Sequence, residues 1–285
     1  ALHDQLTGLR NRRGMQASLD EAMVQAGTDG DKVGLLFVDI DDFKAVNDTA
    51  GHEVGDQVLA AVAGRLEGMA QAGTVLTRPG GDEFVAVAKA PGDAALHALG
   101  QRIVDSMHEP VNVGARTFRL TCSVGIAQFP DDARDPGSLL RWADMAMYGA
   151  KAAGKNRFNV FTPELRTQRM RRVEIEMALR GAIDRGEFTL DFQPQFDMVT
   201  RRMVGAEALL RWRHHALGSV APGVFVPVAE DMGIVHEVGR WVFEAACRQS
   251  RAWSDAGLRT PRLAVNLSPQ QLGPKLADQW QHGLA

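Results

Sequence analysis

In the first half of the chain, short apolar runs alternate with segments whose apolar residues recur at helical spacing. The run 33–38 is brief and rich in branched side chains, which predicts a buried strand leading directly into Asp39. Helical periodicity follows the glycine-rich turn 51–55, with the apolar residues of 58–69 on one face. The same reasoning predicts helices over about 11–26, 93–107 and 139–154, and strands over 74–77, 84–88, 117–120, 122–127 and 157–161.

Two of the predicted strands flank the stretch Pro79-Gly80-Gly81-Asp82-Glu83, whose paired glycines indicate a hairpin turn. Because hairpins alternate with helices, the order predicts an α+β sandwich, with helices packed on a mostly antiparallel sheet. We place this first domain at residues 1–162. Residues 163–185 are rich in Arg, Glu, Met and Leu, which predicts a helical connector. The arginines of this connector favour a solvated helix face over an anion site: Arg166, Arg169, Arg171 and Arg172.

The hydrophobic period changes in the second half of the chain. Residues 188–192, 203–210 and 263–267 read as strands, and a long helical pattern through 234–245 separates the last two. This order predicts the opening of an α/β domain over 186–285. A complete (β/α)₈ barrel needs about 250 residues, so we expect only its first part. The chain starts on a motif-like segment and ends within an element pattern, so we expect a piece of a longer protein.

Composition narrows the class of partner. Hydrophobic residues make up 45% of the 285-residue chain and charged residues 24%, which is typical of globular domains. With 32 basic against 35 acidic residues, the chain has no excess of positive charge that would attract a nucleic acid polymer or an anionic membrane. We therefore expect a small partner. No apolar stretch reaches the roughly 18 residues of a membrane span, and no basic-then-apolar leader is present. We expect Cys122 and Cys247 to be buried thiols in a reducing compartment.

Two groups of acidic residues stand where predicted strands end. Asp39, Asp41 and Asp42 follow one strand, and Asp82 and Glu83 lie on the turn with Gly80 and Gly81. Carboxylates at a sheet edge need a partner, and hard cations such as Mg²⁺ prefer oxygen ligands. Glycines allow backbone N–H groups to approach a phosphate closely. This pattern indicates metal-assisted phosphoryl or nucleotidyl transfer, while the alternative is that the acids merely decorate loops.

Further polar residues suit a nucleotide. Lys151 and Lys155 are four residues apart on a predicted helix, where they repel unless an anion such as a triphosphate lies between them, or are simply solvated. Asn47 and Asp56 offer an amide and a carboxylate that could read a guanine edge. His52 either hydrogen-bonds a substrate or supports its glycine-rich turn.

Five motifs occur in order. They are segment 4–13, beginning Asp4-Gln5-Leu6-Thr7; Asp39-Ile40-Asp41-Asp42-Phe43-Lys44; Asn47-Asp48; Gly51-His52 with Gly55-Asp56; and Gly80-Gly81-Asp82-Glu83-Phe84. Together they resemble the GGDEF family of diguanylate cyclases. The resemblance implies a palm-like fold related to nucleotide cyclases, and condensation of two GTP into cyclic di-GMP with release of pyrophosphate. Because each domain of that family holds one GTP, it also implies a homodimer.

The resemblance implies roles for individual residues. Mg²⁺ or Mn²⁺ would be bound by Asp39, the Ile40 carbonyl and Asp82, with Glu83 as a further ligand or proton acceptor. Asn47 and Asp56 would hold guanine with His52 nearby, and Lys151 would bind phosphate. The expected GTP-binding set is Phe43, Lys44, Asn47, His52, Asp56, Gly80, Gly81, Lys151 and Lys155.

Three positions depart from the family pattern. Lys155 stands where the family often has Arg, which keeps the charge but loses the bidentate fork. Pro79 fixes one backbone angle just before the glycines. The Arg-x-x-Asp of the family's product-inhibition site is replaced by Gln71-Ala72-Gly73-Thr74, so feedback inhibition through that site is not expected.

The second half resembles the beginning of an EAL-type cyclic di-GMP phosphodiesterase. The matching motifs, in order, are Gln193-Pro194-Gln195, Glu207-Ala208-Leu209-Leu210-Arg211-Trp212, Phe225-Val226-Pro227-Val228-Ala229-Glu230 and Asn266-Leu267-Ser268-Pro269. The resemblance implies that Glu207 and Asn266 are metal ligands and that Gln193, Leu210 and Arg211 touch the dinucleotide. The later acidic motifs and the lysine of that family are missing from this sequence, so we expect no phosphodiesterase activity from it.

The sequence therefore predicts a diguanylate cyclase domain joined to part of an EAL domain, working in the cytoplasm where GTP is found. An alternative is a silent GTP-binding module that regulates a phosphodiesterase in the full-length protein. In a third interpretation, phosphodiesterase is the main activity of the parent protein.

Overall fold

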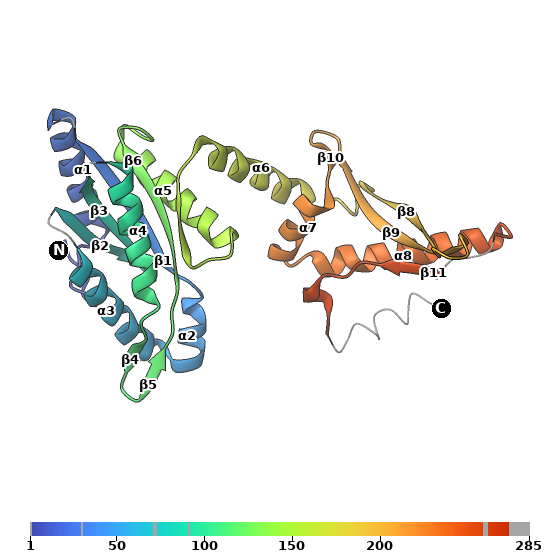
Figure 1. Cartoon of the computed structure of the whole chain (residues 1–285), viewed down its shortest axis with the longest axis horizontal. Coiled ribbons are helices and arrows are strands. Elements are labelled where there is room, and N and C mark those ends of the chain that lie inside the picture. The colour runs from blue at the N-terminus through green and yellow to red at the C-terminus, as the bar shows by residue number, and fades with distance from the viewer. Residues whose placement is uncertain (1, 30, 71–72, 91, 259–261, 274–285) are drawn as a thin grey trace. The chain divides into compact units, whose positions relative to one another are not determined.

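The computed structural model describes residues 2–29, 31–70, 73–90, 92–258 and 262–273 (Figure 1). The chain folds into two compact units, Ala1–Arg169 and Met170–Ala285, which are described separately. The division falls within helix α6 (Pro163–Leu179). The predicted domain limits at 162/163 and 185/186 stay predictions. Of the departures named above, Gln71 and Ala72 lie outside the described residues.

The first unit is built on a five-stranded sheet in the order β2-β3-β1-β6-β7. Its strands are β1 (Lys32–Ile40), β2 (Thr74–Gly80), β3 (Glu83–Ala90), β6 (Cys122–Phe129) and β7 (Arg157–Val160). β1 pairs antiparallel with both β3 and β6, and only the β6–β7 pair is parallel. The predicted α+β fold with a mostly antiparallel sheet is therefore confirmed.

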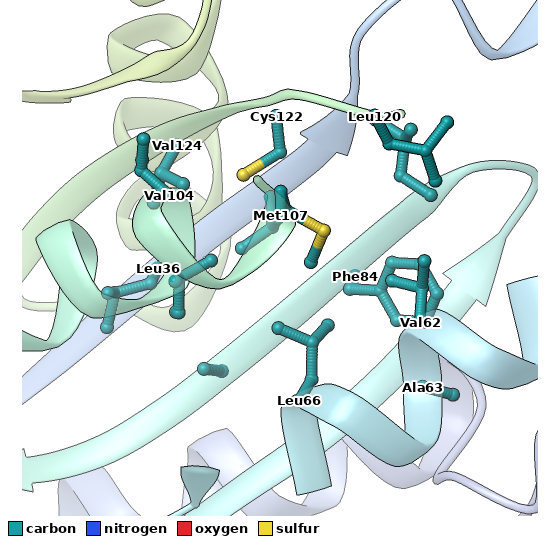
Figure 2. Close-up of a cluster of buried hydrophobic side chains, with 14 of the residues drawn as sticks. Leu36, Val62, Ala63, Leu66, Phe84, Val104, Met107, Leu120, Cys122 and Val124 are labelled. Carbon is teal, nitrogen blue, oxygen red and sulfur yellow. The ribbon is translucent and has the colours of Figure 1, made fainter. Parts of the chain in front are cut away.

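Helices cover both faces of this sheet because the central strand is apolar on both. Alternate residues of β1 enter different cores: Leu36, Val38 and Ile40 enter one, and Val33, Leu35 and Phe37 enter the other. The first core includes residues of α3 (His52–Met69) and α4 (Asp93–Met107). Figure 2 shows Val62, Leu66 and Met107 among the side chains of this core. The second includes residues of α1 (Arg12–Asp29) and α5 (Pro136–Ala152). A sheet buried on both sides is a rigid base for its strand ends.

Three details of the first unit differ from the sequence predictions. A short helix, α2 (Phe43–Ala50), follows β1, and the small hairpin β4 (Val111–Val113) with β5 (Arg116–Phe118) replaces the strand predicted over 117–120. The helix predicted to end near Gly154 ends at Ala152. Cys122 is buried as expected, and burial raises the pKa of its thiol.

The second unit holds β8 (Phe188–Phe196), β9 (Met203–His214), β10 (Gly218–Val220) and β11 (Arg262–Val265), with α7 (Pro222–Asp231), α8 (Val235–Asp255) and the short 3₁₀ helix η1 (Pro269–Gln271). β9 pairs antiparallel with β8 and β10 and parallel with β11. Parallel strands joined through helices confirm a partial α/β domain. Its core packs Phe188, Trp212 and Phe225 together, with ring centroids 5.3–6.1 Å apart. In this unit Cys247 is only partly buried, so the expectation of a buried thiol was wrong there.

The arginines of α6 each have a local partner. Arg166 lies over the Trp142 ring at 5.0 Å and Arg169 over the Tyr148 ring at 4.0 Å, both within the first unit. In the second unit Arg171 pairs with Glu174, and Arg172 pairs with Glu176 and Asp231. Arg166 and Arg171 are exposed, so the solvated helix face that the sequence favoured is confirmed for these two, while Arg169 and Arg172 are partly buried. None of the helices in the described residues is long and apolar enough to cross a membrane.

Candidate active site

The acidic residues of the first unit meet because of strand register. Asp39 is paired with Glu83 of β3 on one side of β1 and with Ser123 of β6 on the other. The amide of Ile40 donates to the carbonyl of Asp82 at 3.4 Å. The central strand and the turn between β2 and β3 thus bring Asp39, Ile40, Asp82 and Glu83 to one end of the sheet. We call this set the acidic edge.

The acidic edge is electrostatically unfavourable without a cation. Asp39 is 7% exposed, and burial raises the pKa of its carboxyl, with Asp82 and Asp41 adding to the rise against the opposing effect of Lys151. Burial also raises the pKa of Glu83, and the charges of Asp39, Asp144 and Asp82 raise it further. Crowded carboxylates beside a backbone carbonyl are the oxygen donors that Mg²⁺ and Mn²⁺ take. The residues therefore fit a divalent metal.

The two other carboxylates after β1 are already used. Asp41 is buried and accepts hydrogen bonds from the Thr121 and Ser123 hydroxyls at 2.7 Å, and from the amide of Asn156 at 3.1 Å. Asp42 precedes α2 with a φ of 54° and faces the ammonium of Lys155. Asp41 and Asp42 therefore make local contacts in their loops. This agrees with the alternative interpretation, in which they take no part in metal binding.

Lys151 and Lys155 do not form the helical pair that their spacing predicts. Lys151 lies in the last turn of α5, but Lys155 follows the helix with a φ of 60°. The chain turns there because the amide of Lys155 returns to the carbonyl of Ala150 at 3.1 Å. Each ammonium meets a carboxylate at 2.7 Å, Lys151 on Asp39 and Lys155 on Asp42. Neither lysine therefore needs an anion to relieve repulsion from the other.

A cavity of about 490 Å³ lies beside the acidic edge. Helix α2 contributes Phe43, Lys44 and Asn47, and α3 contributes His52 and Asp56. The lining continues to Gly81 and Asp82 of the turn. Gly55 leaves room for the Asn47 side chain, since a Cβ there would lie 2.0 Å from the side-chain oxygen of Asn47. The structure thus brings together the residues predicted for guanine and joins them to the turn predicted for phosphate.

The sequence reasoning missed Arg78, which also lines this cavity. Arg78 is 8% exposed; its guanidinium donates to the carbonyl of Gly81 at 2.6 and 3.0 Å and to the Asp4 carboxylate at 2.9 Å. Burial opposes ionisation of Asp4, but hydrogen bonds from Thr7 and Arg78 outweigh it and lower the pKa of Asp4. We call Asp4, Arg78 and Gly81 the turn bracket. The signal that could have identified Arg78 from the sequence is its charge, directly before Pro79 and the paired glycines.

The second unit brings together part of its predicted set. The Asn266 amide donates to a Glu207 carboxylate oxygen at 2.7 Å, and Gln193 lies directly opposite Glu207 in the β8–β9 ladder. Leu210 is on the other face of β9, where it packs against the hydrophobic core. Arg211 pairs with Asp191 at 2.8 Å. Glu207, Asn266 and Gln193 thus form a group, while the side chain of Leu210 points away from it.

Glu187, His214 and His215 form a third group, with ligand atoms within 4.8 Å of one another. The Glu187 carboxylate and one nitrogen of His214 already have partners. The Glu187 carboxylate accepts from Arg185 at 2.7 Å and Trp212 at 3.0 Å, and His214 Nδ1 accepts from the amides of Ala216 and Leu217 at 3.3 and 3.2 Å. The hydrogen bond from Arg185 lowers the pKa of Glu187 more than any other contact. A local ion pair therefore balances this carboxylate, and we assign it no metal.

The first unit is a mixed α+β domain with a cluster of carboxylates at one end of its sheet, and comparison with known proteins gives its family. The profile of the diguanylate cyclase GGDEF domain matches residues 1–157, and that of the EAL domain matches residues 176–284. The chain belongs to the GGDEF family, and its GGDEF domain is followed by part of an EAL domain. This is the combination found in cyclic di-GMP signalling proteins.

Two relatives of the chain are named for the synthesis or the breakdown of cyclic di-GMP. The chain is 39% identical over 273 residues to the bifunctional diguanylate cyclase/cyclic di-GMP phosphodiesterase MucR of Pseudomonas aeruginosa, covering 95% of this chain and 40% of the relative. It is 38% identical over 271 residues to the cyclic di-GMP phosphodiesterase PdeR of Escherichia coli, covering 94% and 40%. The chain thus spans less than half the length of these relatives.

Solved structures match the first unit. The GGDEF domain of YfiN (TpbB) from Pseudomonas aeruginosa superposes with a TM-score of 0.57 at 33% identity, covering 58% of this chain and 97% of that one. The coiled coil and GGDEF domain of DgcB from Caulobacter crescentus, in complex with c-di-GMP, gives a TM-score of 0.51 at 30% identity, covering 56% and 85%. Both agree with the sheet and helices described above.

Proposed function

We propose that the first unit is a diguanylate cyclase that condenses two GTP into cyclic di-GMP and two pyrophosphates. In each of two steps, the 3′-hydroxyl of one nucleotide attacks the α-phosphorus of the other, and pyrophosphate leaves. The observation that carries this proposal is the acidic edge lying against the cavity that holds Asn47 and Asp56. A nucleotide whose base enters that cavity would carry its phosphates toward Gly81 and Asp82.

The residues divide the work by their chemistry. Asp39, the Ile40 carbonyl, Asp82 and Glu83 would hold Mg²⁺ or Mn²⁺, which when bound would polarise the phosphate under attack. Asn47 and Asp56 would pair with the guanine edge, with His52, Phe43 and Lys44 around them. Amides of Gly80 and Gly81 and the ammonium groups of Lys151 and Lys155 would bind phosphate. Glu83 would be a further ligand or would accept the hydroxyl proton.

One domain binds one GTP in this scheme, so two copies must face each other for the reaction. We therefore propose that the active form is a homodimer. Because the substrate is GTP, we also place the domain in the cytoplasm.

The test is to incubate the purified chain with GTP and Mg²⁺ and to separate the nucleotides by chromatography. We expect cyclic di-GMP from the wild type and from Glu67→Ala, an exposed residue of α3. Asp82→Ala should reduce turnover by on the order of 10³-fold or more, because charge stabilisation at the transferring phosphate is lost. Equal thermal unfolding of the variants would show that the loss is catalytic. Retained turnover in Asp82→Ala would contradict the metal assignment.

A second candidate is a GTP-binding domain without turnover that regulates a phosphodiesterase in the longer protein. It is favoured by the ion pair between Lys155 and Asp42, which occupies a lysine otherwise available to phosphate. In that case the same assay would give tight GTP binding and no product. Glu207 and Asn266 would then belong to the phosphodiesterase of the parent protein, and we expect no hydrolysis of cyclic di-GMP by the 285-residue chain itself.

A further inference from the structure

Lys151 is bonded to a residue of the metal site instead of extending into solvent. Its Nζ lies 2.7 Å from Asp39 Oδ1, and the two side chains are 31% and 10% exposed. This ion pair is partly removed from water, and it is less screened than a pair on the open surface. It therefore influences what else can bind to Asp39.

The Asp39 carboxylate cannot keep its ion pair with the Lys151 ammonium and also bind a divalent cation. The two cations would be separated by only a few ångströms, where their repulsion is strong even at the dielectric of a protein surface. Metal binding at Asp39 therefore requires Lys151 to move away. Lysine suits such a movement, since its ammonium is a point charge on a flexible stem and the side chain is not enclosed.

A destination for the displaced ammonium lies at the same end of the sheet. Gly81 and Asp82 line the cavity that would admit a nucleotide, and Asp82 belongs to the acidic edge with Asp39. The phosphates of a nucleotide bound there would give Lys151 a new anionic partner. One lysine would then contact a carboxylate before substrate binds and a phosphate afterwards.

We propose that Lys151 is an exchangeable counter-ion that couples metal binding to triphosphate binding. It opposes a metal arriving alone, and it favours a metal that arrives together with a nucleotide triphosphate. This inference rests on the metal site of the proposed function. It makes Lys151 a positioning residue for the cation as well as a phosphate ligand.

Lys89 supplies a matched comparison within the chain. It is an exposed lysine of β3, six positions along the strand from Glu83, and it has no part in the proposed site. Removing Lys89 lowers the positive charge of the domain by the same amount as removing Lys151.

The experiment measures Mn²⁺ binding to the full chain without nucleotide, by the electron paramagnetic resonance signal of free Mn²⁺. We expect Lys151→Met to bind Mn²⁺ at least about fivefold more tightly than the wild type, the lower end of ordinary coupling between sites. Lys151→Arg should keep the weak affinity because it keeps a cation on Asp39. Lys89→Met should stay within about twofold of the wild type, since it leaves the Lys151–Asp39 pair intact.

A second titration adds 3′-deoxy-GTP, which carries the triphosphate but lacks the attacking hydroxyl. It should tighten Mn²⁺ binding to the wild type by a larger factor than it does for Lys151→Met. Equal Mn²⁺ affinity of Lys151→Met and the wild type, with or without nucleotide, would overturn the inference. So would an equal gain in Lys89→Met, because the effect would then be general electrostatics.

Asp39→Asn separates failure of this inference from failure of the proposed function. If Asp39→Asn binds Mn²⁺ as the wild type does, the metal site itself is misplaced and both proposals fail. If Asp39→Asn loses Mn²⁺ while Lys151→Met matches the wild type, the metal site stands and only the exchange is wrong.

Discussion

The acidic edge and the turn bracket meet at the turn between β2 and β3, yet their electrostatics are opposite. In the acidic edge, burial and neighbouring carboxylates raise the pKa of Asp39 and of Glu83. In the turn bracket, hydrogen bonds from Thr7 and Arg78 overcome burial and lower the pKa of Asp4. In the turn bracket, the protein holds the Asp4 carboxylate in its charged form. In the acidic edge, the carboxylates are crowded together, so they favour an added cation. This contrast is typical of a functional site supported by a stable frame.

The largest expected effect comes from removing the centre of the turn bracket. Arg78→Met should destabilise the first unit by about 1–3 kcal/mol, because the carbonyl of Gly81 and the Asp4 carboxylate lose the charged donor that the buried Arg78 supplies. Denaturant unfolding measures this, with Arg102→Met on the exposed side of α4 as the control. If both variants unfold at the same denaturant concentration, Arg78 does not support the turn.

A smaller effect is expected where α2 meets α3. Gly55→Ala would place a Cβ 2.0 Å from the Asn47 side-chain oxygen and displace that side chain from the cavity. We expect a weaker affinity for GTP, by roughly tenfold for one lost bidentate-type contact. Gly64→Ala in the same helix meets nothing within 4 Å and should stabilise the helix slightly without changing GTP binding. Equal GTP affinity in the two variants would remove Asn47 from the proposed guanine site.

The smallest effect is a difference in pH dependence between the two regions. The pKa of Asp4 is lowered in the folded state, so its contribution to stability is present above 3.8 and lost as the pH falls through the folded value. The pKa of Glu83 is raised, so its ionisation costs stability as the pH rises above 4.5. Asp4→Asn should therefore destabilise at pH 7 and less at pH 3, whereas Glu83→Gln should stabilise at pH 7 and not at pH 4.

Thermal unfolding across this pH range checks both signs, and each effect is expected to stay below about 1 kcal/mol. Destabilisation by Glu83→Gln at pH 7 would mean that the acidic edge is not electrostatically unfavourable.

Local sequence patterns were sufficient to predict where the carboxylates of the acidic edge lie. The apolar run of β1 ends at Asp39 and the paired glycines mark the turn before Glu83, so two strand ends could be located without knowing the register. The fold class followed from the order of elements in the same way. Residues close in sequence to a strand end or a glycine turn were therefore well predicted in position, and their chemical roles stay predictions.

Contacts between residues far apart in the sequence could not be predicted from those local patterns. Asp4 and Arg78 are 74 positions apart, and nothing local to either residue shows that they meet. The spacing of Lys151 and Lys155 was misleading because α5 ends at Ala152, where residues with positive φ turn the chain away. Helix α7 was missed because it contains Pro227, which normally argues against a helix interior.

The central claim is that Asp39 and Asp82 hold a divalent metal beside a bound GTP. The most direct measurement is a crystal structure of the chain grown with Mn²⁺ and 3′-deoxy-GTP, using anomalous scattering to locate the manganese. The account predicts an anomalous peak between the carboxylates of Asp39 and Asp82, with Lys151 turned from Asp39 toward the triphosphate. Nucleotide in the cavity with manganese elsewhere, or with Lys151 still bonded to Asp39, would contradict it.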